Sequence, residues 1–299
     1  MGKQAIFAEA KLAGASPEAI RFHYDVGTDF FKSWLGEELV YSAARWSEPL
    51  ATSNRPATLE FAQAAKLDFH LNAVGAGAGT SLLDIGFGWG GLIRRAIRVF
   101  DVAEAHGVTL SAEQFAYVRA QNLPRTKLRL ESYETLALAR PVDGIVSIGA
   151  FEHFAKPGLN RKTKLAVYRG FFERCHLFLK PDARLSLQSS FWSGIARSHA
   201  AAIVPSSVFP ESDLPFLDEI LEGAERGFRV LHLETSGNDY TRTLCEWLRR
   251  LRQAHAHALV DDKKFAFYED FLRRSIVGFK RHRIRLARIV FERMSSFTA

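Results

Sequence analysis

The stretch Leu82–Gly91 of this 299-residue chain has the sequence LLDIGFGWGG. Its apolar beginning is typical of a buried parallel strand, and the glycines after it are typical of a tight turn. Because Gly86 and Gly88 have no Cβ, the backbone there can turn sharply and approach a ligand closely. The residues from Gly91 have helical spacing, and a helix start presents free N–H groups. The stretch therefore predicts a strand, a glycine-rich turn and a helix that together can hold a ligand.

Two features separate this turn from a dinucleotide-binding site. The arrangement Asp84-x-Gly86-x-Gly88 lacks the third glycine of the dinucleotide fingerprint. No Asp or Glu ends the second predicted strand, where a ribose ligand usually lies and where residues 107–111 read GVTLS.

Strands and helices alternate along the chain on both sides of this stretch. Apolar runs predict strands over 81–86, 104–110, 127–132, 143–149, 183–190 and 228–234, and a last strand near Arg283. Helical spacing predicts helices over 90–100, 111–123, 162–179 and 216–225, and two long helices that begin near Asp239 and Asp262. The alternation predicts an α/β fold with a doubly wound parallel sheet.

A single domain is expected, because 299 residues fit one large α/β unit. Residues 1–75 are interpreted as an N-terminal helical cap and residues 76–190 as the ligand-binding core. Residues 191–228 are interpreted as an insertion that caps the pocket, and residues 229–299 as the rest of the core.

Composition narrows the class of protein further. The two cysteines, Cys175 and Cys245, form neither a disulfide framework nor a metal spacing. His255 and His257 are two residues apart on a predicted helix and face different ways, so no metal site is expected. The chain shows no signal-peptide pattern and no run of about 18 apolar residues, which predicts a cytoplasmic protein. The net charge is +7, but no Lys/Arg tract is long enough to resemble a nucleic-acid arm.

Six segments, in order, resemble the cyclopropane-fatty-acid synthase and mycolic-acid cyclopropane synthase family of S-adenosylmethionine-dependent methyltransferases. They are FHYDVGTDFF (22–31), VYSAARW (40–46), LLDIGFGWGG (82–91), GVTLSAEQ (107–114), IVSIGAFEHF (145–154) and NDYTRTLCEWLRRL (238–251). VFPESDLP (208–215) also matches the family's Phe-Pro-x-x-x-Leu-Pro connection. The resemblance implies a Rossmann-like class I methyltransferase sheet with N-terminal helices and a helical cap insertion. It also implies S-adenosylmethionine as the cofactor.

The resemblance further implies which residues hold this cofactor. Tyr41 and Ser42 would contact its methionine part, and Thr109 would lie on its ribose side. The family's acidic residue after the third strand appears here as Ser132, beside Glu131. The complete expected set is Tyr41, Ser42, Asp84, Gly86, Gly88, Gly90, Thr109, Leu110, Gln114, Glu131 and Ser132.

The resemblance implies that the acceptor is an alkene carbon. Attack of this carbon on the methyl group leaves a carbocation. Aromatic faces stabilise such a cation when water is excluded. Motif positions place these residues at the reacting pocket: His23, Tyr24, Phe30, Phe31, Trp46, Phe151 and Tyr240. Core packing is the competing interpretation for each aromatic residue among them, and a Phe-rich core alone would explain the 24 phenylalanines.

One departure from the family bears on the product. The family holds a bicarbonate ion that removes a proton from the added methyl group, using a Cys, a Glu, a His and a Tyr. The Glu and the Tyr are present as Glu152 and Tyr240, but Ala43 replaces the Cys and Gln188 replaces the His. A carboxylate in an apolar pocket has a raised pKa that suits a general base, so Glu152 becomes the candidate base itself.

We therefore expect methyl transfer without ring closure to an apolar acceptor, either a lipid alkene or a terpenoid- or polyketide-like molecule. Three alternatives stay open: a true cyclopropane synthase on phospholipid acyl chains, an N- or O-methyltransferase of a small metabolite, and a non-catalytic cofactor- or lipid-binding protein. Intact Tyr-Ser, Asp-x-Gly-x-Gly and Phe-Glu-His motifs argue against the last. The basic run Arg273–Arg293 predicts peripheral contact with an anionic membrane, and a solvated helix face is the competing interpretation.

Overall fold

A seven-stranded sheet forms the centre of the computed structural model, which describes residues 14–16, 18–20, 26–46, 58–194, 209 and 211–295. The strand order is β3-β2-β1-β4-β5-β7-β6. The strands are β1 (Ser81–Ile85), β2 (Glu104–Thr109), β3 (Thr126–Leu130), β4 (Val142–Ile148), β5 (Leu179–Trp192), β6 (Phe228–Ser236) and β7 (Ile284–Arg293). The order reverses direction at β1, and such a switch point leaves a crevice at the carboxyl ends of the strands.

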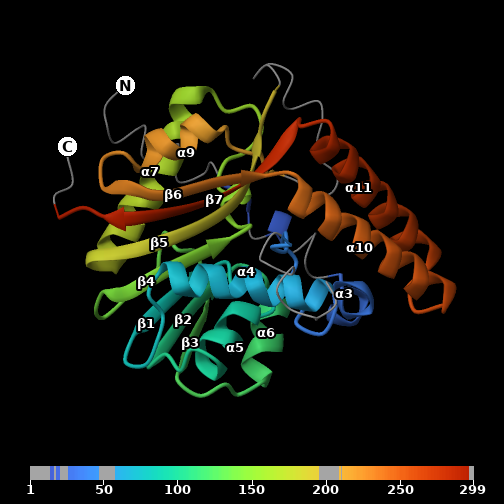
Figure 1. Cartoon of the computed structure of the whole chain (residues 1–299), viewed down its shortest axis with the longest axis horizontal. Helices are drawn as coiled ribbons and strands as arrows, with labels where there is room; N and C mark the ends of the chain where they lie inside the picture. Colours follow the sequence, from blue (N-terminus) through green and yellow to red (C-terminus); the bar gives the residue numbers. More distant parts are fainter. Residues whose placement is uncertain are drawn as a thin grey trace.

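The predicted all-parallel sheet needs one correction. Strands β1 to β5 pair in parallel, but β7 is antiparallel to both β5 and β6. β7 follows a pair of helices, and the second of them ends beside the top of β5, so the chain enters β7 from the opposite end (Figure 1). The apolar run alone marks a strand but carries no information on its direction.

β5 also begins earlier than expected, at Leu179 rather than Ala183. Its pairing with β4 shifts register between Val142 and Gly144, and Pro181 lies in this irregular part. A proline has no N–H to donate, and such a shift removes the need for one. The preceding helix, α7 (Arg161–Phe178), therefore continues directly into the strand.

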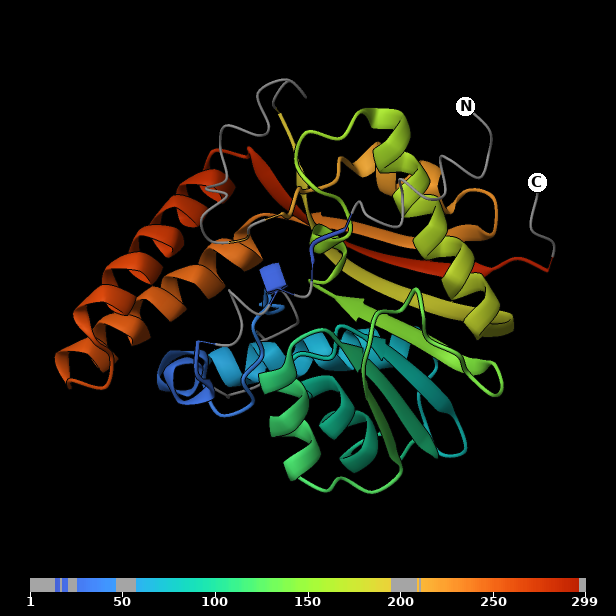
Figure 2. The same cartoon turned by 180° about the vertical axis from the view of Figure 1, so that it is seen from behind.

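Helices cover both faces of the sheet (Figures 1 and 2). α7 and α9 (Leu217–Ala224) pack on one face, where Leu83, Ile85 and Ile145 point. α4 (Leu59–Ala73), α5 (Gly91–Arg98) and α6 (Ala112–Ala120) lie on the other face, toward Leu82 and Val146. Neighbouring residues on one strand thus serve opposite cores, which explains why these strands read as continuous apolar runs.

A third apolar cluster lies beyond one end of the sheet. It joins α3 (Thr28–Leu35) to α10 (Asn238–Ala256) and α11 (Asp262–Lys280). α10 and α11 form a helix pair that projects from the sheet (Figure 1). Among the described helices, none is long and apolar enough to cross a bilayer.

Candidate active site

The first cavity lies at the carboxyl ends of β1, β2 and β4, which is where the switch point predicts a ligand. Ten of the eleven expected cofactor residues line it: Tyr41, Ser42, Asp84, Gly86, Gly88, Thr109, Leu110, Gln114, Glu131 and Ser132. The eleventh, Gly90, is the N-cap residue of α5 and has φ +79°, and a Cβ there would lie 2.9 Å from Val118. Gly90 therefore serves the packing of the turn and is not part of the lining.

The glycine-rich turn leaves room for a ligand in the way the sequence predicts. Gly86 has φ +83°, and a Cβ on it would come within 2.6 Å of the Ala150 Cβ. Gly88 has φ +54°, and a Cβ on it would meet no described atom within 4 Å. Gly88 lines the cavity, so this is open space that a bound cofactor can approach. The shape of the turn thus fits a nucleoside-type cofactor.

The wall of this cavity also contains a buried lysine, Lys66, that the sequence did not predict. Lys66 of α4 is fully buried, and its Nζ donates a hydrogen bond to Ser42 Oγ at 2.8 Å. Burial lowers the pKa of Lys66 to about 7, and Arg288 lowers it further while Asp84 opposes this. Burial also raises the pKa of Asp84 to about 7, against the opposing effect of Lys66. The available signal was the stripe Ala62–Lys66–His70, a cation at helical spacing on the inner face of α4.

The second cavity adjoins the first and has a different character. Both cavities share Tyr41, Ser42, Gly149 and His153 in their walls. The described lining of the second is largely apolar and aromatic, with Pro157, Trp192, Phe209, Leu214, Tyr240, Phe271 and Leu286. A methyl donor in the first cavity and an apolar acceptor in the second would meet at the shared wall.

Glu152 lies in the wall of the second cavity, on the short 3-10 helix η1 (Phe151–His153). Its Oε1 accepts a hydrogen bond from the backbone N–H of Ser190 at 2.7 Å. Its Oε2 is buried and has no hydrogen-bond partner among the described residues. Burial raises the pKa of Glu152 to about 7, although the hydrogen bonds from Ser190 oppose this. Burial and the Glu152 charge also raise the pKa of Tyr240, so its phenol stays protonated.

Four aromatic residues expected in the pocket lie in the core behind its walls. Phe31 packs against Tyr41 and Trp89, with ring centroids 5.4 and 4.7 Å away. Phe151 stacks on Tyr168 at 4.6 Å. The four are Phe30, Phe31, Trp46 and Phe151, and each is buried without lining either cavity. The motifs place these residues close to the pocket, but spacing does not say which side of a ring faces it. His23 and Tyr24 lie outside the described residues.

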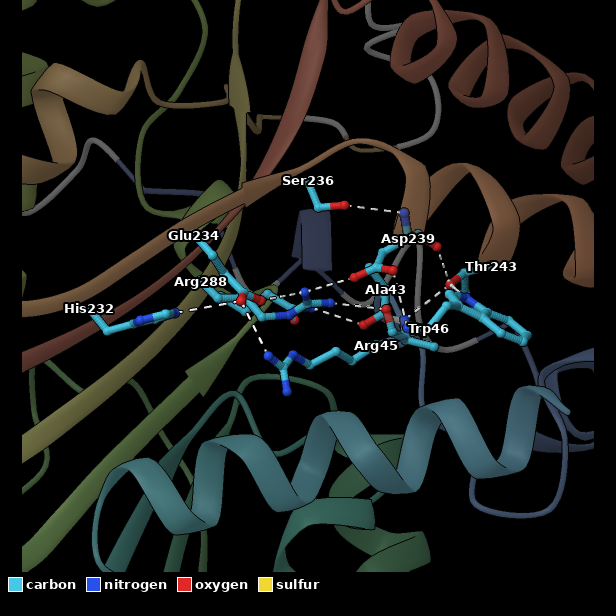
Figure 3. A network of polar contacts seen from close by, with 11 residues as sticks. Ala43, Arg45, Trp46, His232, Glu234, Ser236, Asp239, Thr243 and Arg288 are labelled. Atoms are coloured by element: carbon cyan, nitrogen blue, oxygen red, sulfur yellow. Dashed lines mark hydrogen bonds and ion pairs between the residues drawn. The ribbon is translucent and has the colours of Figure 1, made fainter. Parts of the chain in front are cut away.

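Gln188 lies in the wall of the second cavity, but both ends of its amide are engaged. Its Nε2 donates to Ala43 O at 3.3 Å, and its Oε1 accepts from Arg288 Nε at 2.8 Å. Figure 3 shows the wider network, in which Arg288 lies between Glu234 and Asp239. Arg288 Nη1 contacts these carboxylates at 2.8 and 2.9 Å, and Nη2 donates to Ala44 O at 3.0 Å.

Sequence reasoning also missed Arg288, which is 1% exposed and lies in the middle of β7. Its one visible signal was a charged residue inside the otherwise apolar run Leu286–Phe291. Among the residues described, no group of three His, Cys, Asp or Glu side chains lies close enough to hold a metal ion.

The sheet order, the glycine-rich turn and the paired cavities define a class I S-adenosylmethionine-dependent methyltransferase. Residues 13–289 match the family model described as mycolic acid cyclopropane synthetase, and the chain belongs to this family.

Individual relatives agree with this assignment. Cyclopropane mycolic acid synthase 2 of Mycobacterium leprae (strain TN) is 32% identical over 280 residues, covering 85% of this chain and 86% of that protein. Cyclopropane mycolic acid synthase 3 of Mycobacterium tuberculosis (strain ATCC 25618 / H37Rv) is 35% identical over 250 residues, covering 78% and 81%. The solved structure of the cyclopropane synthase MmaA2 from Mycobacterium tuberculosis superimposes with a TM-score of 0.80 at 29% identity, covering 93% of this chain and 99% of that one.

A second solved structure bears on the cofactor. Mycolic acid cyclopropane synthase CmaA1, complexed with SAH and CTAB, has a TM-score of 0.78 and 28% identity to this chain. The cofactor of this methyltransferase family is S-adenosylmethionine. All these relatives are named cyclopropane synthases, so the comparisons favour the alternative with ring closure over the expectation of transfer without it.

Proposed function

We propose that this enzyme transfers a methyl group from S-adenosylmethionine to an alkene carbon of an unsaturated lipid chain and closes a cyclopropane ring. The observation that carries the proposal is the buried Glu152 Oε2, which lies without a hydrogen-bond partner among the described residues in the wall of an apolar cavity. The names of the relatives supply the lipid acceptor and the ring.

The residues of the chain position the two reactants, exclude water from the site and provide a base. When bound, S-adenosylmethionine supplies an electrophilic methyl group. The shared wall of Tyr41, Ser42, Gly149 and His153 aligns the two reactants, and the apolar second cavity excludes water. The alkene would attack the methyl carbon as the methyl–sulfur bond breaks, so that S-adenosylhomocysteine leaves with that electron pair. The acceptor would then carry a cation, which the rings of Tyr240 and Trp192 in the lining would stabilise.

Glu152 Oε2 then accepts a proton from the added methyl group. The electrons of that C–H bond close the three-membered ring and cancel the cation. The fraction of Glu152 that is ionised near neutral pH suits this step, because its pKa is about 7.

The residues present do not fit a bicarbonate site. Ala43 offers only a methyl group where the family has a thiol. The Gln188 amide is held by Arg288 and by the Ala43 carbonyl. These two positions favour a second candidate function, transfer without ring closure, in which the cation loses a proton elsewhere to give a methyl- or methylene-bearing product.

Mass spectrometry of lipids after incubation with methyl-labelled S-adenosylmethionine tests both candidates. We expect a gain of one CH₂ unit with the double bond lost and no branch methyl. A branched or exocyclic methylene product would establish the second candidate. Label on a nitrogen or oxygen atom would overturn both.

A further inference from the structure

Two buried side chains of opposite charge lie in the wall of the cofactor cavity. Lys66 comes from α4 and is 0% exposed, and Asp84 comes from the end of β1 and is 5% exposed. Burying such groups is costly unless a partner compensates for the lost water. Each favours the charged form of the other, but no ion pair joins them directly among the described contacts. An α-amino acid zwitterion bears the complementary pair of charges.

The hydrogen bond from Lys66 fixes how Ser42 can act. Lys66 Nζ donates to Ser42 Oγ at 2.8 Å, so the hydroxyl proton of Ser42 is directed to another acceptor. Ser42 lines the cavity, and its backbone carbonyl is held by Gln63 Nε2 at 3.0 Å. The arrangement presents an O–H donor to the cavity with an ammonium group directly behind it. A donor of this kind suits a carboxylate.

We propose that Lys66 is a positioning residue for the carboxylate of the cofactor's methionine part, acting through the Ser42 hydroxyl. The proposal rests on the cofactor class and on no assumption about the acceptor. Its rival is a purely structural role, in which Lys66 only ties α4 to the segment that contains Ser42.

The charged groups around Lys66 support its action through the Ser42 hydroxyl. Arg288 and Asp84 act on Lys66 with opposite sign, and burial keeps the neighbouring His70 neutral by lowering its pKa well below the usual value. His70 Nδ1 is hydrogen-bonded to Ser186 Oγ at 2.8 Å. The ionised fraction of Lys66, whose pKa is about 7, is therefore the cation that contacts Ser42. Lys66 loses its charge and Asp84 gains its charge as pH rises through about 7, so their effects on cofactor affinity oppose each other. A substitution therefore distinguishes a positioning role of Lys66 from a structural role better than a pH titration does.

The test compares two ligands that differ in the amino-acid part. S-adenosylhomocysteine has the carboxylate and the ammonium group, and 5′-methylthioadenosine lacks both. Calorimetry measures both affinities in the wild type, in Lys66→Met, in Ser42→Ala and in the double variant. Lys66→Met should weaken S-adenosylhomocysteine about 10- to 100-fold, the range of a charge-assisted hydrogen bond, and change 5′-methylthioadenosine by less than about twofold.

The other outcomes decide against the proposal. Equal losses for the two ligands, or no loss for either, would leave Lys66 a structural residue. In the Ser42→Ala background the Lys66 substitution should add less than about threefold, whereas a full additive loss would exclude action through Ser42. If circular dichroism shows that Lys66→Met does not fold, Ser42→Ala alone must show the loss that is selective for S-adenosylhomocysteine. Absence of that selectivity overturns the proposal that Lys66 acts through Ser42. None of these measurements needs an acceptor, so an error in the proposed reaction leaves the result intact.

Discussion

Glu152 is the residue whose chemistry the proposed function uses most directly. Glu152→Gln keeps an acceptor oxygen for the Ser190 N–H but removes the base. Turnover should fall about 100-fold or more, the range of a lost general base, while S-adenosylhomocysteine affinity stays unchanged. Labelled-methyl transfer and calorimetry measure the two effects.

Glu219→Gln is the matched control for this variant. Glu219 is a buried carboxylate that accepts from the Phe216 N–H and lies near Lys164, outside both cavities. Its turnover should stay near that of the wild type. Unchanged turnover in Glu152→Gln would remove Glu152 from the mechanism.

The raised pKa of Glu152 also predicts opposite effects of pH on activity and stability. Activity at saturating cofactor should rise with pH through about 7, since the base must be ionised. The free energy of unfolding should fall as pH rises. A carboxyl whose pKa rises from 4.5 to about 7 on folding binds more protons in the folded state than in the unfolded state.

The stabilising contribution of Glu152 is complete below pH 4.5 and is lost as pH rises through 7. Glu152→Gln should therefore be more stable than the wild type at pH 8, by about 3 kcal/mol, and nearly equal to it at pH 5. Urea unfolding at the two pH values measures the difference. The shift of Asp84 occurs in both proteins and cancels. A stability difference that does not grow with pH would contradict the burial of an ionised Glu152.

Arg288 links β7 to the strands and the helix around it. It joins β5 through Gln188, β6 through Glu234 and α10 through Asp239. Arg288→Met would leave the buried Asp239 carboxylate without its ion-pair partner, so the free energy of unfolding should drop by about 3–5 kcal/mol.

Arg229→Met is the control on the neighbouring strand. Arg229 pairs with Glu292, and its side chain is 68% exposed. Its loss should cost less than about 1 kcal/mol. Equal costs for the two arginines in urea unfolding would mean that the buried network contributes nothing beyond a surface pair.

The difference between local sequence patterns and contacts distant in sequence explains which parts of the structure the sequence can predict. Strands such as β1 and β4 follow from local apolar runs, and the turn at Gly86 follows from its residue types, so both are predictable. The partners of Lys66 and Arg288 lie 24 and 49 to 244 residues away, and no local pattern encodes such contacts. Phe31 shows a second limit of prediction from sequence. Motif spacing places the residue near the pocket, but its ring packs against Trp89 in the core.

The basic run Arg273–Arg293 does not form one continuous surface. Arg288 is buried, and Arg293 Nε donates to the His176 carbonyl at 2.9 Å, so these two serve the fold. The exposed charges of the run lie on α11 and just after it: Arg273, Arg274, Lys280, Arg281 and Arg283. The helix pair that carries them also provides Tyr240 and Phe271 to the wall of the apolar cavity. A membrane held by this surface would lie beside the acceptor site.

We therefore expect salt-sensitive binding to vesicles that contain anionic lipid. The fourfold variant Arg273→Gln, Arg274→Gln, Lys280→Gln and Arg281→Gln should lose most of this binding at low salt, since each such charge contributes about 1 kcal/mol. The matched variant changes four exposed charges at the β2–β3 end of the sheet: Arg98→Gln, Arg119→Gln, Lys127→Gln and Arg140→Gln. It has the same net charge, so it should keep the binding if the α11 surface is the docking site. Vesicle sedimentation across a salt series distinguishes the two. Equal losses would reduce the effect to net charge, and no binding by the wild type at low salt would favour an acceptor delivered free in solution.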